Sequence, residues 1–164
     1  MILIKIFWRI RCFIKRTLLK LIFGKRLRIG KNTHFRKNFC ILLEKGGEIV
    51  IGDNCFFNRS CSINCLEKVE IGRKTIFGEN VKIYDQNHRF CEKDEFIRDQ
   101  GYSVASVKIG ENCWIGSNAV ILKGVTIGDN SVVGAGCIVN RDVPPNSIVK
   151  PGGGIIIEPI RYKK

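Results

Sequence analysis

A six-residue period of large apolar residues constrains the fold of this chain more than any other feature. Isoleucine or valine recurs at every sixth position over Ile109, Ile115, Ile121, Ile127, Val133 and Val139. A small or moderately apolar residue stands two positions before each next repeat, at Cys113, Ala119, Val125, Ser131, Cys137 and Val143. An amphipathic helix needs a period near 3.6 and a half-buried strand a period of 2, so neither explains the pattern. The period instead predicts a parallel β-helix, in which each hexapeptide forms one flat face and three faces, about 18 residues, make one coil.

The same period continues, with interruptions, in the preceding part of the chain. Three further sets of large apolar residues keep the spacing: Ile71, Phe77 and Ile83; Ile51, Phe57, Ile63 and Val69; and Ile29, Phe35 and Ile41. Two extra residues enter between Val69 and Ile71, which indicates a bulge at one corner, and an irregular EKGGE stretch precedes Ile49. We therefore expect one solenoid of roughly five coils over residues 29 to 147. A coil cannot bury its inner face alone, so both ends need a cap.

The net charge of +13 resembles that of a nucleic-acid-binding protein until the charges are located. Residues 1–31 hold ten basic residues and no acid, so the rest of the chain carries 18 basic and 15 acidic groups, a net of only +3. The predicted β-helix has no recognisable nucleic-acid motif and no aromatic stacking platform. The sequence therefore predicts no nucleic-acid partner.

The eight cysteines indicate neither a disulfide framework nor a metal site. Four of them, Cys55, Cys61, Cys113 and Cys137, occupy the small inward position of the hexapeptide, where a free thiol acts as a small hydrophobe. Cys61 and Cys65 lie close together in the sequence, but no second pair completes a zinc ligand set. Unpaired buried thiols predict a reducing compartment and hence a cytoplasmic protein.

The N-terminal segment, residues 1–28, is predicted to form a basic amphipathic helix. It has neither an apolar run long enough to span a bilayer nor the features of a signal peptide. On a helix, one face collects Leu3, Ile6, Phe7, Ile10, Ile14, Leu18 and Leu21, and the opposite face collects Lys5, Arg9, Arg16 and Lys20. Two interpretations remain open: a helix that rests on anionic lipid, and a helix that covers the open first coil or packs between subunits.

The repeat is broken once by a long polar insertion. After Ile83 the next hexapeptide is due near residue 89, yet the pattern resumes only at Ile109, so residues 85–107 must loop out from a corner. Long ordered loops on repeat scaffolds are usually functional. The insertion begins with Asn87 and His88, and the only other histidine, His34, lies in the first coil. Imidazole titrates near neutral pH, so His88 is the candidate general base.

Residues 71–146 resemble the left-handed β-helix hexapeptide acyltransferases. The resembling elements are IGRKTIFGENVKIYDQNH before the insertion and IGENCWIGSNAVILKGVTIGDNSVVGAGCIVNRDVPPNSIV after it. The most similar branch contains the galactoside, maltose and nodulation-factor O-acetyltransferases and the sugar acetyltransferases of capsule and exopolysaccharide synthesis. The resemblance implies a left-handed coil, a homotrimer, acetyl-CoA as the acyl donor, no metal, and a hydroxyl of a sugar or glycan as the acceptor. The corresponding domain division is a helix over 1–28, a β-helix over 29–150 and a tail over 151–164.

The resemblance also implies roles for individual residues. His88 matches the catalytic histidine of the family, and Asn58 matches an asparagine that holds the acceptor hydroxyl or the histidine. Trp114 and Ser117 match positions beside the pantetheine arm and the thioester carbonyl. The remaining matches line the coenzyme groove between two subunits: Gly78, Ala135, Asn140 and Arg141.

The chain departs from the family at its end and at the acceptor site. The tail reads KPGGGIIIEPIRYKK instead of a Gly-x-Pro turn followed by a basic strand, and Cys65 and Leu66 stand near the place of an acidic pair that some sugar acetyltransferases use. We therefore expect an acceptor other than a simple glycoside.

Rival functions fit the sequence less well than transfer to a sugar hydroxyl. The β-helix carbonic anhydrases need three histidine ligands, and the chain has two histidines. Serine acetyltransferases carry a long helical N-terminal domain that this sequence lacks. A non-catalytic scaffold and an acyltransferase acting on a sugar amino group or another small acceptor remain as alternatives.

Overall fold

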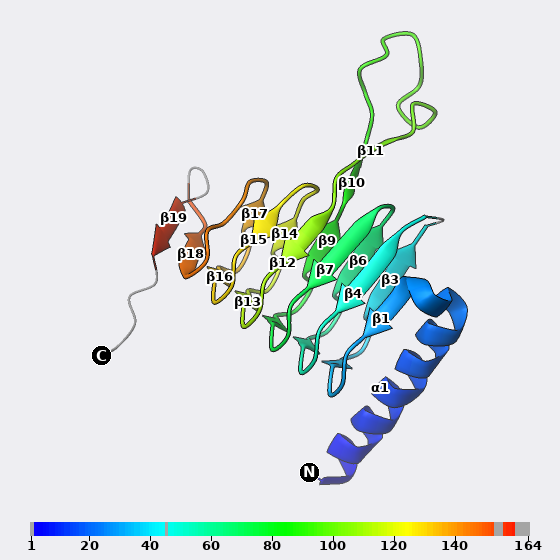
Figure 1. The fold of residues 1–164 in the computed structure, drawn as a ribbon, viewed down its shortest axis with the longest axis vertical. Helices are drawn as coiled ribbons and strands as arrows, with labels where there is room; N and C mark the ends of the chain where they lie inside the picture. The colour runs from blue at the N-terminus through cyan, green and yellow to red at the C-terminus, as the bar shows by residue number, and fades with distance from the viewer. Residues whose placement is uncertain (1, 45, 153–155, 160–164) are drawn as a thin grey trace.

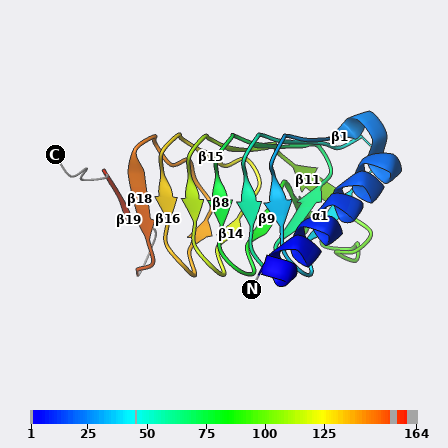
Figure 2. The ribbon, with the colours of Figure 1, turned by 90° about the horizontal axis from the view of Figure 1, so that it is seen from below.

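The chain winds into a three-faced solenoid of parallel strands, with one helix at its N-terminal end and a hairpin that projects from one edge (Figure 1). This computed structural model describes residues 2–44, 46–152 and 156–159, and of residues 2–9, 156, 158 and 159 it describes the backbone alone. Seen from below, the coils stack in sequence order from the helix to the C-terminal end (Figure 2). The parallel β-helix expected from the six-residue period is confirmed.

Three parallel sheets, here called A, B and C, form the faces. Sheet A consists of β1 (Leu27–Ile29), β4 (Glu48–Ile51), β7 (Lys68–Ile71), β12 (Val107–Ile109) and β15 (Thr126–Ile127). Sheet B consists of β2 (His34–Phe35), β5 (Phe56–Phe57), β8 (Ile76–Phe77), β13 (Trp114–Ile115), β16 (Val132–Val133), β18 (Ser147–Lys150) and β19 (Ile156–Pro159). Sheet C consists of β3 (Cys40–Leu43), β6 (Ser62–Cys65), β9 (Lys82–Tyr84), β14 (Val120–Ile121) and β17 (Ile138–Val139). Within these sheets only β19, which folds back on β18, runs antiparallel to its neighbour.

The register between strands shows how the coils differ in length. Ile109 pairs with Ile127, which defines the regular coil of three hexapeptides. The first two coils are slightly longer, since Leu27 pairs with Ile49 and Ile49 with Val69. The third, in which Val69 pairs with Val107, is much longer because it contains the insertion. The chain thus completes five coils and begins a sixth, in agreement with the expected number.

The two extra residues of the second coil lie at a different place from the one predicted. Val69 and Ile71 both point inward from the same strand, β7, with 0% and 3% of their surfaces exposed. The additional length is instead at the corner between Cys65 and Lys68. Strict alternation along β7 buries both apolar residues, so no bulge is needed between them.

The small inward positions of the repeat are buried as predicted. Cys55, Cys61, Cys113 and Cys137 are each at most 3% exposed, and all eight cysteines are free thiols. Burial raises the pKa of each of these four thiols above its ordinary value. A raised pKa disfavours the thiolate, so these side chains act as packing groups and not as nucleophiles.

Phenylalanine rings form a continuous stack through the N-terminal coils. The ring centroids of Phe35 and Phe39 are 4.7 Å apart, those of Phe39 and Phe57 are 4.9 Å apart, and those of Phe57 and Phe77 are 4.3 Å apart. Phe39, Phe57 and Phe77 are among the largest fully buried side chains. Rings of this size fill the prism where the coils are longer than the regular repeat.

Two columns of left-handed backbone conformations turn the corners of the prism. At the corner between sheets A and B, positive φ angles occur at Asn32, Asn54, Lys74, Asn112, Asn130 and Asn146. At the corner between sheets B and C they occur at Asn38, Ser60, Asn80, Asn118 and Gly136. Asparagine is the non-glycine residue that adopts this conformation most readily, which explains its recurrence in the repeat.

Helix α1 (Ile2–Phe23), followed by the 3₁₀ turn η1 (Gly24–Arg26), lies across the first coil (Figures 1 and 2). Cys12 is buried, and its Sγ accepts a hydrogen bond from the Phe35 N–H at 3.4 Å. Lys15 donates to the carbonyl oxygen of Phe39, and Arg16 donates to that of Gly30 at 3.3 Å. No helix in the described part of the chain is long and apolar enough to cross a membrane.

The helix caps the first coil with a face other than the one the sequence suggested. Ile10, Ile14, Leu18 and Leu21, from the predicted apolar face, are exposed, whereas Arg16, from the predicted basic face, is half-buried against the coil. The expectations for Leu3, Ile6 and Phe7, and for Lys5 and Arg9, fall on side chains outside the described part of the structure. Long cationic side chains can pack their methylene stems on apolar surface, so a basic stripe can serve as the packed face.

Candidate active site

The insertion begins and ends as a two-stranded antiparallel ribbon. Strand β10 (Gln86–His88) pairs with β11 (Tyr102–Val104), and the N–H of Arg89 donates to the Gly101 carbonyl at 3.0 Å. Figure 1 shows the ribbon leaving the edge of the solenoid directly after β9, with the remaining loop beyond it. The ribbon gives the first residues of the insertion a regular backbone, which a polar loop alone would not provide.

His88 is held against Tyr102 at the outer end of this ribbon. The two residues are cross-strand partners, and their ring centroids lie 4.5 Å apart with an interplanar angle of 40°. The His88 side chain is exposed, and Tyr102 is 44% exposed. The imidazole is therefore oriented by a ring contact while remaining accessible from solvent, as a group that accepts a proton from a substrate requires.

Asp85 anchors the base of the ribbon. Its buried carboxylate accepts hydrogen bonds from the N–H groups of Leu66, Glu67 and Lys68, at distances of 2.8 to 3.1 Å. Its carbonyl oxygen accepts the N–H of Ala105, on the returning side of the ribbon, at 2.9 Å. One residue therefore joins the corner at Cys65–Lys68 to both sides of the insertion.

The Asp85 carboxylate also raises the pKa of a neighbouring thiol, that of Cys65. Burial, reinforced by the negative charge of Asp85, raises the pKa of Cys65 to about 12. This thiol therefore stays protonated at neutral pH and cannot serve as a nucleophile beside the insertion.

We expect Tyr102→Ala to lower kcat about two- to tenfold, because an aromatic pair contributes about 0.5–1.5 kcal/mol and the ring positions His88. Tyr102→Phe retains the ring and should restore most of the activity, whereas KM for the acyl donor should not change in either variant. The measurement is steady-state kinetics on both proteins. Equal loss in the two variants would assign the effect to the hydroxyl group instead of to the ring contact.

Gly78, Ser117 and Ala135 lie on neighbouring coils at the corner between sheets B and C. A Cβ at Gly78 would be 2.5 Å from the backbone nitrogen of Ser117, and one at Gly116 would be 2.5 Å from that of Ala135. The Ser117 hydroxyl oxygen accepts the N–H of Glu79 at 3.0 Å. Close stacking of the coils thus requires glycine at position 78, independently of any bound ligand. Ala135 is exposed beside the column.

Asn58 and Trp114 flank this column. Asn58 follows β5 and is half-buried, and its Oδ1 accepts hydrogen bonds from Arg36 at 3.3 Å and from the backbone of Arg59 at 2.9 Å. Trp114 points outward from sheet B, with 54% of its surface exposed, next to Ile76 of the coil before it. An exposed indole on a flat sheet is a surface on which another molecule can pack.

A groove along β17, at the C-terminal end of the solenoid, contains the last two predicted residues, Asn140 and Arg141. Its lining consists of Gly136, Cys137, Ile138, Asn140, Arg141, Lys150, Pro151 and Gly152. Arg141 and Lys150 give the groove a positive charge, and Gly136 and Gly152 form part of its wall. The combination fits a narrow chain that ends in phosphate groups.

The structure brings Asn58, Gly78, Ser117 and Ala135 to the corner between sheets B and C, whereas Asn140 and Arg141 follow β17 and lie at the corner between sheets C and A, from which the insertion also leaves. Asn58, Gly78 and Ser117 follow strands of sheet B, whereas His88 follows β9 of sheet C. Within one chain His88 and the column that contains Gly78 and Ser117 therefore lie on different edges of a rigid prism. Among the described residues, no group of three or more His, Cys, Asp and Glu side chains is placed to hold a metal ion.

Three residues of this region were absent from the sequence-based site. Tyr102 and Asp85 act through the pairing and anchoring of the ribbon, and a polar loop sequence gives no periodic signal for either contact. Lys150 lines the groove because β18 extends sheet B beside β16. Val132 pairs with Ile148, so this last turn of the chain is shorter than the regular coil.

Comparison with known proteins places the fold in a family. Residues 106–141 match the sequence model described as bacterial transferase hexapeptide (six repeats). Nodulation protein L of Rhizobium meliloti is 48% identical over 105 residues, which are 63% of this chain and 56% of that protein. Galactoside O-acetyltransferase of Escherichia coli is 42% identical over 105 residues, 63% of this chain and 50% of that protein. The chain thus spans about half the length of these curated relatives.

Solved structures agree over more of the chain. A maltose O-acetyltransferase from Clostridium difficile is 33% identical, with a TM-score of 0.69 over 87% of this chain and 75% of that one. A hexapeptide-repeat acetyltransferase from Vibrio cholerae, complexed with acetyl-coenzyme A, is 31% identical, with a TM-score of 0.68 over 79% of this chain and 68% of that one. The chain belongs to the hexapeptide-repeat acyltransferase family, and its β-helix is the left-handed form that the resemblance implied.

Proposed function

We propose that this protein transfers an acetyl group from acetyl-CoA to a hydroxyl of a sugar or glycan intermediate in surface polysaccharide synthesis. The observation that carries the proposal is the exposed imidazole of His88, fixed against Tyr102 on an ordered ribbon in a chain whose relatives include a galactoside and a maltose O-acetyltransferase. The groove lined by Arg141 and Lys150 suits the phosphates of the coenzyme.

His88 has the role of a general base in this reaction. A sugar hydroxyl is too weakly acidic to attack a thioester unaided, so the imidazole accepts its proton as the new C–O bond forms. A backbone N–H near Ser117 is the candidate donor to the oxyanion of the tetrahedral intermediate. When the intermediate collapses the C–S bond breaks, and the proton held by His88 passes to the departing sulfur. Asn58 holds the acceptor hydroxyl or the imidazole, and Trp114 lies beside the pantetheine arm.

The separation of His88 from the column that contains Gly78 and Ser117 leads us to propose a homotrimer with a shared site. Three copies around an axis parallel to the solenoid bring the edge that carries His88 in one copy to the corner with Gly78 and Ser117 in the next. Exposed apolar groups at Ile76, Trp114 and Ile138 supply surface for such contacts. Light scattering in mild buffer should give the mass of three copies, and a fully active monomer would contradict the shared site.

The acceptor class is tested with acetyl-CoA and a panel of sugars, nucleotide sugars and lipid-linked glycans, followed by mass spectrometry. The expected product carries one acetyl group that alkaline hydroxylamine removes, as it removes an ester. An acetyl group resistant to hydroxylamine would indicate transfer to an amino group. The absence of any acetylated product across the panel, with coenzyme binding intact, would favour a non-catalytic scaffold.

A further inference from the structure

The outward face of helix α1 is apolar and has no partner within the described part of the chain. Its inward face packs Cys12, Leu19 and Phe23 on the first coil. On the opposite side four residues at helical spacing, Ile10, Ile14, Leu18 and Leu21, are between 51% and 75% exposed. An apolar stripe on the solvent side of a helix that already caps a core is not needed for that cap.

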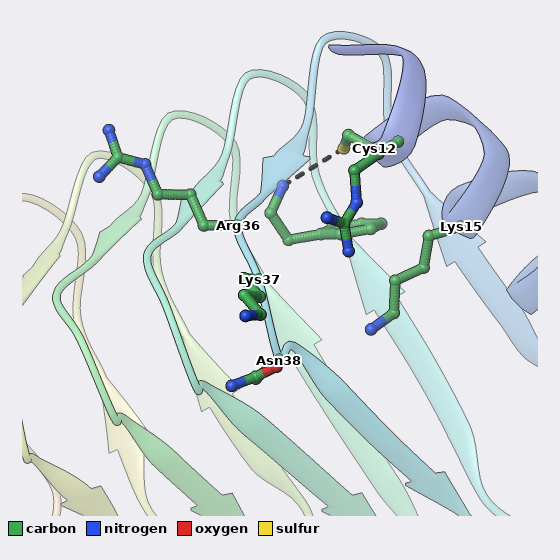
Figure 3. A pocket seen from close by; sticks show the side chains of 7 residues that line it. Cys12, Lys15, Arg36, Lys37 and Asn38 are labelled. Carbon is green, nitrogen blue, oxygen red and sulfur yellow. Dashed lines mark hydrogen bonds between the residues drawn. The ribbon is translucent and has the colours of Figure 1, made fainter. Parts of the chain in front are cut away.

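Positive charge surrounds this apolar stripe. The segment 1–43, which comprises the helix and the first three strands, contains twelve basic side chains and no acid. A pocket between the helix and the first coil is lined by Arg11, Lys15, Arg36 and Lys37, together with Cys12, Phe35 and Asn38. Figure 3 shows Lys15 reaching from the helix toward the first coil, where Lys37 and Asn38 form the turn between β2 and β3.

The contacts of the pocket residues show that several cations are held in place. Lys15 donates to the Phe39 carbonyl, and the Arg36 guanidinium lies 5.4 Å from the ring centroid of Phe56 while donating to Asn58. Burial and the neighbouring charge of Arg11 lower the pKa of Lys15, and the pocket lining contains no carboxylate, so a phosphate group in the pocket relieves the repulsion between these cations.

We infer that the N-terminal end of the protein docks on an anionic phospholipid bilayer, with the apolar stripe of α1 at the acyl boundary and the basic pocket on headgroup phosphates. The two features are complementary to the two layers of a membrane interface, apolar below and anionic above. The helix lies across the end of the solenoid, so the stripe meets the surface without displacing the cap (Figures 1 and 2). The trimer proposed above would place three such helices at one end, and the insertion then begins two coils, roughly 10 Å, beyond the first coil.

Vesicle flotation with the full-length protein tests this inference without acetyl-CoA, so its outcome is independent of the transferase proposal. The probes are vesicles of phosphatidylcholine alone and vesicles that also contain phosphatidylglycerol. Wild-type protein should float with the anionic vesicles, and the bound fraction should fall with salt, because surface charges are screened over about 8–10 Å at physiological ionic strength.

Two pairs of substitutions separate the stripe from the pocket. Leu18→Asp with Leu21→Asp should abolish flotation, and Arg36→Gln with Lys37→Gln should weaken it about 25-fold, since each cation near an anionic surface contributes about fivefold. Phe96→Asp is the matched control for exposed apolar residues, and Lys108→Gln with Lys123→Gln is the control for charge; both should float as wild type. Circular dichroism should show that all variants are folded.

Three outcomes would overturn the inference. One is equal flotation of wild type and the Leu18→Asp, Leu21→Asp variant. Another is equal binding to neutral and anionic vesicles with no effect of salt. The last is a wild-type protein that does not float with vesicles, together with a Leu18→Asp, Leu21→Asp variant whose mass in light scattering is lower than that of the wild type. This result would assign the stripe to contacts between copies of the chain.

Discussion

Replacing His88 with alanine is expected to lower kcat by about 10²–10⁴-fold, because positioned general-base catalysis contributes an effect of this size. The affinity for acetyl-CoA should remain almost unchanged, since His88 lies on the insertion and not among the groove residues that include Arg141. Steady-state kinetics give kcat, and calorimetric titration with CoA gives the affinity. The exposed position of the side chain means that the variant should fold normally.

The other histidine provides a matched control. His34 lies in β2 of the first coil and is also exposed, so His34→Ala removes the same group at another place on the solenoid. Its kcat should stay close to that of the wild type. If His88→Ala retained most of its activity, or if an acetylated cysteine accumulated when the enzyme met acetyl-CoA alone, direct transfer with His88 as base would be wrong.

Replacing Phe57 with alanine is expected to reduce the free energy of unfolding by about 3–5 kcal/mol, the range for deleting a fully buried aromatic side chain. Phe57 is 0% exposed and stacks on Phe77 on one side and packs against Phe39 on the other. Its removal leaves a cavity that the hydrogen-bonded coils on both sides prevent from closing.

Urea titration of both phenylalanines of β5 measures the effect. Phe56→Ala is the control, because Phe56 precedes Phe57 on the same strand but points outward, where it contacts Arg36. Its cost should be at most about 1 kcal/mol, the contribution of a partly exposed cation–π contact. Similar losses for the two variants would contradict the assignment of inward and outward faces on this strand.

The coils were predictable because an inward apolar residue recurs at every sixth position in many successive hexapeptides. The core receives Ile109, Ile115 and Ile121 from three different faces. A spacing of six residues fits few folds other than a three-faced β-helix. The asparagines of the corners also carried a signal, with Asn112 and Asn130 one regular coil apart, that the apolar pattern alone did not use. Left-handed conformations at fixed places in the repeat explain that spacing.

The orientation of α1 was not predictable from its amphipathic pattern. The pattern identifies the most apolar face, which contains Leu18 and Leu21, and the usual inference is that this face packs inward. The coil instead receives Cys12, Leu19 and the stems of Lys15 and Arg16, since backbone carbonyls at the open end of the solenoid accept hydrogen bonds from the two cations. Unpaired carbonyls at a sheet edge do not appear in a hydrophobicity pattern.

The candidate site was predictable as a set of residues but not as an arrangement. The resemblance supplied His88, Asn58 and Ser117, whereas their division between two edges of the prism follows only from the path of the coils. The contact of His88 with Tyr102 depends on cross-strand pairing across a long stretch of polar chain, for which the sequence has no alternating apolar pattern.

A crystal structure of the protein with bound CoA tests most directly whether His88 and the groove form one site. The account predicts CoA along the groove that contains Arg141, with its sulfur beside Ser117 of one subunit. His88 of the neighbouring subunit should lie within hydrogen-bond reach of that sulfur, about 3 Å, or one water molecule away. CoA bound at any place where its sulfur is remote from every copy of His88 would contradict the account.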